Sequence, residues 1–136
     1  MKNVLLFGYG KMGSSIARGW MIKKLNFNVF IIEKQPTLRK IASNDGFKVY
    51  ENIERLKETQ KSKVFEIIFL AVKPQQMEET VKSFSKFNLI KTVFVSIAAG
   101  LSFSWFRNKL NKEVKIVRAM PNLPASIGFG VTGYCK

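Results

Sequence analysis

The sequence lacks histidine altogether and has a single cysteine, Cys135, in 136 residues. The absence of histidine excludes Ser-His-Asp and Cys-His catalysis, histidine metal ligands and acid-base chemistry by an imidazole. One cysteine allows neither an internal disulfide nor a cysteine metal cluster, so we expect no metal site. Any chemistry in which the chain takes part is therefore expected to depend on a bound cofactor.

Long apolar runs and acidic residues are also scarce. No run approaches the ~20 residues of a membrane span, and no cleavable leader precedes the first expected strand, so we expect a cytoplasmic protein without a membrane partner. Asp and Glu number 9 against 23 Lys and Arg, a formal net charge of +14, which makes nucleic acid a candidate partner. The lysines are scattered without a dense basic tract, so we predict no nucleic-acid partner and a basic surface that attracts small anions.

The most informative stretch is residues 4–13, VLLFGYGKMG, in which an apolar run is followed by three glycines spaced G-x-G-x-x-G. The apolar run predicts a parallel strand buried on both faces. Gly8 suits a tight turn, Gly10 lets a pyrophosphate approach the backbone, and Gly13 lets the next helix pack closely. The helix would then direct its free N–H groups at the phosphates.

The context of this motif distinguishes it from a glycine-rich turn in an unrelated fold. A second apolar strand is expected at residues 27–32, and Glu33 follows it about 20 positions after Gly13, where the motif places an acid that binds a ribose. The intervening segment has apolar residues at helical spacing, which we expect to be its buried face: Met12, Ile16, Ala17, Trp20 and Met21.

The rest of the chain continues to alternate between strands and helices. Helices are predicted at residues 36–43, from a cap at Asn52 to about residue 61, from Pro74, and from a cap at Ser102 to residue 110. Their expected inward residues are Leu38 and Ile41 in the first, Ile53 and Leu56 in the second, Met77, Val81 and Phe84 in the third, and Phe106 and Leu110 in the last. Strands are predicted at 47–50, 65–72, 92–97 and 115–119, with 65–72 central, and a non-parallel edge strand at 128–135. We expect one Rossmann-like α/β domain over residues 1–136, a doubly wound, mostly parallel sheet with helices on both faces.

Five stretches should meet at the carboxyl edge of such a sheet, where ligands bind. After the glycine motif, three of them have the sequences AVKPQ at 71–75, SIAAG at 96–100 and RAMPNLPA at 118–125. In this order and spacing they resemble pyrroline-5-carboxylate reductase, the enzyme that makes proline, over nearly the whole chain. The resemblance implies reduction of the cyclic imine 1-pyrroline-5-carboxylate to L-proline with NADPH or NADH.

The resemblance also implies where the cofactor would lie. Phe7, Gly8, Tyr9, Gly10, Lys11 and Met12 would line the pyrophosphate, with Gly13 closing the motif. Glu33 and Lys34 would flank the adenosine ribose, and Asn52 would approach the adenine. Two groups would face the ribose and nicotinamide, namely Ala71, Val72, Lys73 and Pro74, and Ile97, Ala98 and Ala99. Asn122 would border the nicotinamide and the substrate.

Several of these residues also have a plain structural interpretation. Glu33 could be a solvated strand end; if it binds the ribose it would favour NADH, whereas Lys34 and Arg39 could admit NADPH. Lys73 could act through its backbone alone, and Asn122 could hold a turn. Tyr9 and Lys11, the variable positions of the motif, could be surface residues.

Members of this family continue into a C-terminal helical domain that forms the dimer and supplies most of the substrate pocket, whereas this chain ends at Lys136. We therefore expect NAD(P)H binding with little or no imine reduction by the chain alone, and we assign no catalytic residue. The oligomeric state stays open. Two alternatives remain: another dehydrogenase of this fold, such as a hydroxy-acid dehydrogenase or a cofactor-coupled NADP reductase, and a cofactor-sensing or partner-binding module without catalysis.

Overall fold

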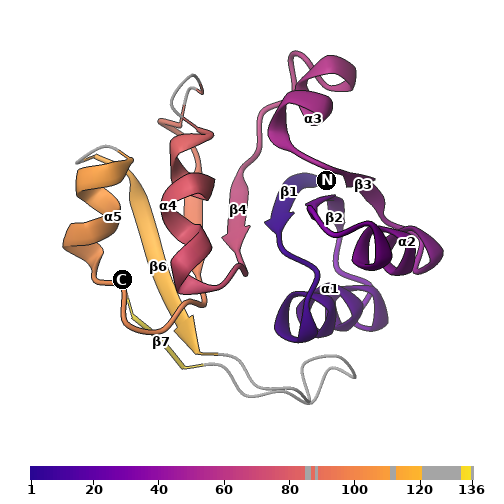
Figure 1. Ribbon diagram of the computed structural model, residues 1–136, viewed down its shortest axis with the longest axis horizontal. Helices are drawn as coiled ribbons and strands as arrows, with labels where there is room; N and C mark the ends of the chain where they lie inside the picture. Colours follow the sequence, from indigo (N-terminus) through magenta and orange to yellow (C-terminus); the bar gives the residue numbers. More distant parts are fainter. Residues whose placement is uncertain (85–86, 88, 111–112, 121–132, 136) are drawn as a thin grey trace.

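The computed structural model of the chain describes residues 1–84, 87, 89–110, 113–120 and 133–135. Strands and helices alternate along them as the sequence predicts (Figure 1). The strands are β1 (Lys2–Phe7), β2 (Phe27–Ile32), β3 (Lys48–Tyr50), β4 (Ile67–Leu70), β5 (Val93–Ser96), β6 (Lys115–Met120) and β7 (Gly133–Cys135). The helices are α1 (Lys11–Ile22), α2 (Pro36–Asn44), α3 (Ile53–Thr59), α4 (Pro74–Lys82) and α5 (Phe103–Lys109).

The strands form one sheet in the order β3-β2-β1-β4-β5-β6-β7. The first six are parallel and β7 pairs antiparallel with β6 at the edge, which confirms the doubly wound, mostly parallel sheet and the central place of β4. The chain leaves β1 toward β3 and then returns to place β4 on the other side of β1. The strand order therefore reverses beside the glycine motif, which is where open α/β sheets form a ligand crevice.

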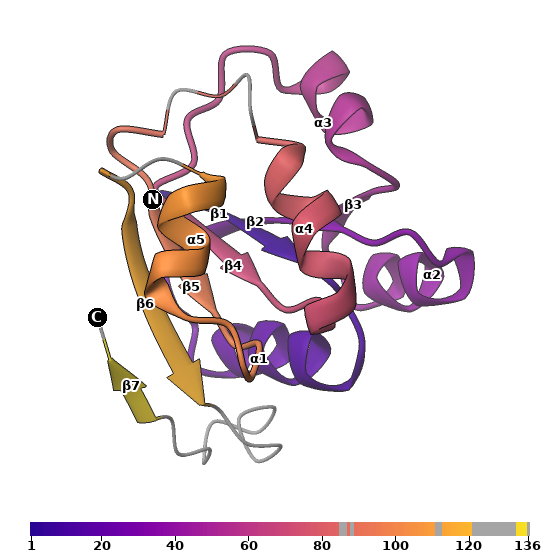
Figure 2. The same ribbon diagram turned by 60° about the vertical axis from the view of Figure 1, so that its left-hand side comes forward.

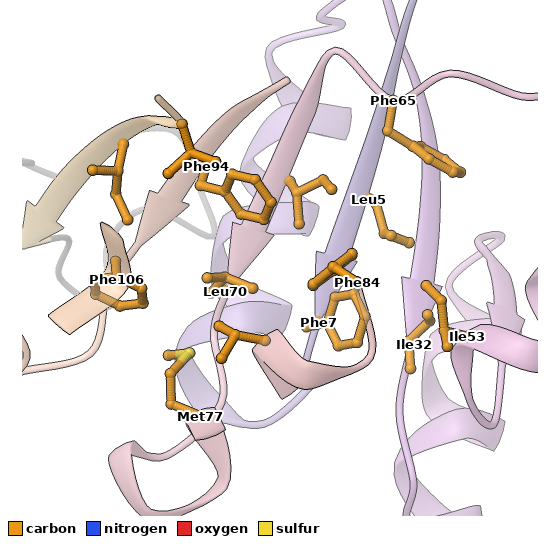
Figure 3. Packing of buried hydrophobic residues seen from close by; sticks show 14 of the residues in the cluster. Leu5, Phe7, Ile32, Ile53, Phe65, Leu70, Met77, Phe84, Phe94 and Phe106 are labelled. Atoms are coloured by element: carbon orange, nitrogen blue, oxygen red, sulfur yellow. The ribbon is translucent and has the colours of Figure 1, made fainter. Parts of the chain in front are cut away.

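Helices cover both faces of the sheet. Figure 2 shows α1 and α2 on one side and α4 and α5 on the other. The smaller core joins β1 and β2 to α1 and α2 through Leu6, Ile31, Ala17 and Ala42. The larger core joins the other face to α3, α4 and α5 (Figure 3).

Phenylalanine rings occupy the middle of the larger core. Phe84, just after α4, packs edge-on against Phe7 and Phe94, with ring centroids 5.1 and 5.5 Å apart (Figure 3). The predicted inward residues of three helices are buried as expected: Ile53 and Leu56, Met77 and Val81, and Phe106. The caps also form as predicted, since the side chains of Asn52 and Ser102 accept hydrogen bonds from backbone N–H groups in the first turns of α3 and α5.

Two predicted core residues lie at the surface. Met21 is 49% exposed because Trp20, one position and about 100° away on the helix, is the residue that packs on Phe27 and Phe69. Ile41 is 38% exposed, whereas its neighbour Ala42 is fully buried against the sheet. Helix α3 also ends at Thr59, earlier than predicted, because Gln60 leaves the helical conformation.

The amino ends of three strands are joined by Asn3. Its backbone N–H donates to Glu66 Oε2 (2.7 Å), its side-chain amide donates to the carbonyl of Val64 (3.0 Å), and its Oδ1 accepts from Asn28 (2.9 Å). This network fixes β1, β2 and the approach to β4 at the edge opposite the glycine motif.

Candidate functional site

A pocket of about 360 Å³ lies at the carboxyl ends of β1, β2 and β4. The register aligns Phe7 with Ile32 and with Leu70, so these three strands end at the same level. The segments that follow them, together with the start of α3 and one side of α4, form the walls. The pocket thus lies at the strand-order reversal.

The glycine motif makes the floor of this pocket because of its backbone geometry. Gly8 has φ +95°, a conformation unfavourable for other residues, and its N–H donates to the carbonyl of Ile32 (2.9 Å). A Cβ at Gly8 would lie 2.6 Å from the carbonyl oxygen of Ala71, and a Cβ at Gly13 would overlap the carbonyl oxygen of Gly8. The tight turn and the close helix packing predicted for these two glycines are both confirmed.

Helix α1 begins at the motif without a side-chain cap. Gly10 is its N-cap residue, no side chain accepts a capping hydrogen bond from the N–H groups of the first turn, and that turn has no acidic residue. A Cβ on Gly10 would meet no atom within 4 Å. The helix therefore presents uncapped N–H groups beside open space, an arrangement that suits an anion.

Glu33 is a fixed part of the pocket wall, so its interpretation as a solvated strand end is wrong. Its side chain is 9% exposed, and Oε2 accepts a 2.6 Å hydrogen bond from the backbone N–H of Tyr9. Oε1 accepts from the N–H of Gln35 at 3.1 Å. The carboxylate therefore links the end of β2 to the glycine motif and has a set orientation.

Tyr9 is buried, so the surface position considered for it is also wrong. Its ring is 1% exposed, and its hydroxyl donates to Asp45 Oδ2 at 2.5 Å. Arg18 of α1 donates to the same carboxylate oxygen at 2.9 Å. The Tyr9 hydrogen bond and Arg18 hold the pKa of Asp45 below its usual 3.8, while burial and Asp45 raise the pKa of Tyr9. This triad anchors the glycine motif to α1 and to the end of α2.

Replacing Tyr9 with phenylalanine is expected to lower the free energy of unfolding by about 1 kcal/mol at neutral pH, because a hydrogen bond to a carboxylate is lost. The pH dependence should change as well. The lowered pKa of Asp45 makes its stabilisation complete above about pH 4 and lost as the pH falls through the folded-state value. In the variant that pKa moves back toward 3.8, so the loss of stability in acid should be smaller.

Urea unfolding at several pH values between about 2 and 7 measures both effects. Tyr50→Phe is the matched control, because Tyr50 is half-buried and its hydroxyl makes no hydrogen bond within the described residues. Equal acid sensitivity of Tyr9→Phe and the native chain would contradict the role given to the triad.

The predicted cofactor-binding residues divide into those that line the pocket and those that do not. Nine predicted residues line the pocket: Phe7, Gly8, Gly10, Glu33, Lys34, Asn52, Ala71, Val72 and Lys73. Exposed Lys11 and Pro74 begin helices α1 and α4, half-buried Met12 lies in the first turn of α1, and Gly13 packs under Gly8. Ile97, Ala98 and Ala99 follow β5, farther along the same edge. Asn122 lies outside the described residues.

Sequence reasoning missed one wall of the pocket. It is formed by one side of α4 and its C-cap residue, namely Gln76, Glu79, Thr80 and Ser83, and Glu51 and Glu54 also line the pocket. The i, i+3, i+4, i+7 spacing on α4 was a usable signal, but a polar stripe opposite Met77 and Val81 has the pattern of an ordinary solvent face. Lys34 reaches this wall, since its Nζ lies 2.6 Å from Glu79 Oε1.

Two other kinds of site are absent from the described part of the chain. No group of three or more cysteine, aspartate or glutamate side chains there is placed to hold a metal ion. No helix there is both long and apolar enough to cross a membrane.

The fold and the pocket define a Rossmann-like α/β protein with a glycine-lined ligand site at its strand-order reversal. The family described as "NADP oxidoreductase coenzyme F420-dependent" matches residues 3–100. The chain belongs to this family.

Its relatives include named enzymes. Over 126 residues it is 28% identical to a pyrroline-5-carboxylate reductase of Aquifex aeolicus, covering 93% of this chain and 44% of that protein. It is 32% identical to the Escherichia coli pyrroline-5-carboxylate reductase, covering 96% and 48%. The crystal structure of Plasmodium falciparum pyrroline carboxylate reductase with NADP bound matches with a TM-score of 0.74 at 27% identity, covering 98% and 47%. The chain thus spans about half the length of the curated relatives it matches.

Proposed function

We propose that residues 1–136 form one NAD(P)H-binding domain that serves as the nucleotide-binding half of a pyrroline-5-carboxylate reductase. The observation that carries the proposal is the joining of the glycine motif to the Glu33 carboxylate, at 2.6 Å, on the wall of one pocket at the strand-order reversal. The names of the relatives favour this reductase over a hydroxy-acid dehydrogenase. A cytoplasmic location and the lack of a nucleic-acid partner stay predictions.

The residues present fit a dinucleotide. The uncapped N–H groups at the start of α1 and the open side of Gly10 suit a pyrophosphate. Glu33 is oriented to accept hydrogen bonds from ribose hydroxyls, with Asn52 on the adenine side. Ala71, Val72 and Lys73 would continue the site toward the nicotinamide, where Pro74, the segment from Ile97 to Ala99, and Asn122 are proposed to lie.

The cofactor would supply a hydride for the imine carbon of 1-pyrroline-5-carboxylate, while the imine nitrogen takes a proton, giving L-proline. The contribution proposed for this chain is to bind and orient the nucleotide, because the hydride chemistry would be supplied by the cofactor itself. Substrate binding, the proton donor and a homo-oligomeric assembly are proposed to depend on the part of the reductase that the relatives have beyond this length.

Calorimetric titration of the purified chain with NADH and NADPH tests the binding. We expect saturable binding of at least one of them. Heat is a better readout than fluorescence because Trp20 and Trp105 do not line the pocket. Failure of both nucleotides to bind would contradict the proposal.

Turnover separates the enzyme from a sensing module. With 1-pyrroline-5-carboxylate we expect little or no NAD(P)H oxidation by the chain alone. Oxidation should appear after addition of the separately produced C-terminal half of the Escherichia coli relative. Nucleotide binding without turnover in the mixture would favour a cofactor-sensing or partner-binding module, and full activity of the chain alone would contradict the division of labour proposed here.

A further inference from the structure

The pocket is acidic although the chain as a whole is strongly basic. Four carboxylates line it, Glu33, Glu51, Glu54 and Glu79, against only two lysines, Lys34 and Lys73, whereas the net charge of the chain is +14. A 2′-phosphate adds about two negative charges to the adenosine ribose. The excess of carboxylates in the pocket would repel this phosphate. A free 2′-hydroxyl is uncharged and would not be repelled.

The carboxylate of Glu33 is preset as an acceptor. Each of its oxygens already accepts one backbone N–H, from Tyr9 at 2.6 Å and from Gln35 at 3.1 Å. A carboxylate oxygen has a second lone pair, so Glu33 can still accept from the two hydroxyls of an unmodified ribose. A phosphate offers no such donors at neutral pH and would repel the carboxylate.

The groups that could compensate for a phosphate at this corner are already engaged. Lys34 forms the 2.6 Å ion pair with Glu79. Arg39 donates to the backbone carbonyls of Glu33 and Lys34, at 3.1 and 2.5 Å. The N–H of Gln35, the N-cap residue of α2, is bound by Glu33 itself. Lys34 would have to leave Glu79 before it could pair with a 2′-phosphate, and Nη1 of Arg39 is held by two carbonyls.

We propose that this pocket binds NADH, which has a free 2′-hydroxyl, more tightly than NADPH. Glu33 is the specificity-determining residue. The ion pair with Glu79 keeps Lys34 from pairing with a 2′-phosphate. The inference rests on the proposed function. The proposed preference differs from the nucleotide in the Plasmodium falciparum structure, which has NADP bound.

Calorimetric titrations with NADH and NADPH test the selection on the intact chain. We expect at least about ten-fold tighter binding of NADH, because like charges at contact range repel by more than the equivalent free energy. Adenosine 5′-diphosphate and its 2′-phosphorylated analogue should show the same order. Equal or tighter binding of NADPH would overturn the selection while supporting the proposed function, and binding of neither dinucleotide would overturn both.

Two adjacent glutamates of α4 give a matched pair of variants. Glu79→Gln releases Lys34 and removes one carboxylate from the pocket, so we expect NADPH binding to tighten several-fold and NADH binding to tighten less. Glu78→Gln removes the same charge, but Glu78 pairs with Lys82 and Lys109 and does not line the pocket, so neither affinity should change by more than about two-fold. Equal gains for NADPH in the two variants would show a general charge effect and overturn the role of the ion pair.

Glu33→Gln addresses the acceptor itself. We expect weaker binding of NADH and a ratio of the two affinities close to one, with NADPH unchanged or improved. Thermal unfolding of the variant shows whether the glycine motif is still held, because glutamine retains one carbonyl oxygen for the N–H of Tyr9. A folded variant that keeps the native preference would overturn the assignment of Glu33.

Discussion

Replacing Gly13 with alanine is expected to lower the free energy of unfolding by about 3 kcal/mol and to abolish nucleotide binding. The added Cβ would overlap the carbonyl oxygen of Gly8 and lie 3.4 Å from the Cβ of Ala71. Neither neighbour can retreat freely. Gly8 is bonded to Ile32 at 2.9 Å, and the N–H of Ala71 donates to Phe7 at 2.8 Å. The helix must therefore move away from the strand, and the N–H groups at its start move with it.

Gly10→Ala is the control for this variant, since its Cβ would meet nothing within 4 Å. It should lose far less stability than Gly13→Ala, about 0.5 kcal/mol for alanine at an N-cap position. It should also bind nucleotide more weakly, because the methyl group projects toward the place proposed for the pyrophosphate. Urea unfolding and calorimetry distinguish the two effects. A native-like unfolding midpoint for Gly13→Ala would show that α1 can accommodate a Cβ beside the carbonyl of Gly8, which contradicts the expected loss.

Replacing Phe84 with alanine is expected to cost about 3–5 kcal/mol of unfolding free energy, the range for deletion of a buried aromatic ring. Phe84 is 1% exposed and packs against three other rings, Phe7, Phe87 and Phe94, with centroid distances of 5.1, 5.6 and 5.5 Å. It holds the end of α4 against the middle of the sheet, so its loss leaves a cavity between them (Figure 3).

Phe103→Ala, at the half-buried start of α5, removes the same ring from the edge of that core. This variant should lose about 1 kcal/mol of unfolding free energy, because the half-buried ring of Phe103 buries less apolar area than that of Phe84. Chemical denaturation of both variants measures the difference. Similar losses would mean that the cluster around Phe84 can collapse to fill the space.

The sequence was a good guide wherever one local signal decided the structure. Pro74 at the start of α4, Asn52 at the cap of α3 and the apolar spacing of Met77 and Val81 each depend on contacts within one element and its nearest strand. The glycine motif was equally readable, because its turn and packing requirements are built into residues without a Cβ.

Features that depend on contacts between distant segments were not predicted. The burial of Tyr9 requires Asp45 and Arg18, which only the β1-β2-β3 pairing and the packing of α1 and α2 bring together. The inclusion of Glu79 in the pocket wall likewise depends on the approach of α4 to Lys34 across the strand-order reversal. In each case the local pattern fits an exposed residue, and the tertiary partner changes the outcome.

The network around Asn3 has a consequence for the order in which the molecule can fold. Asn3 is bonded to Asn28, 25 positions away, and to Glu66, 63 positions away. β1 can pair with β2 as soon as β2 has been synthesised. The other edge of β1 has no partner until the chain has been extended past α3 to β4. Closing that longer loop costs more entropy, and parallel pairing of distant strands is slow. The most buried strand of the molecule is therefore the one that waits longest for its second neighbour.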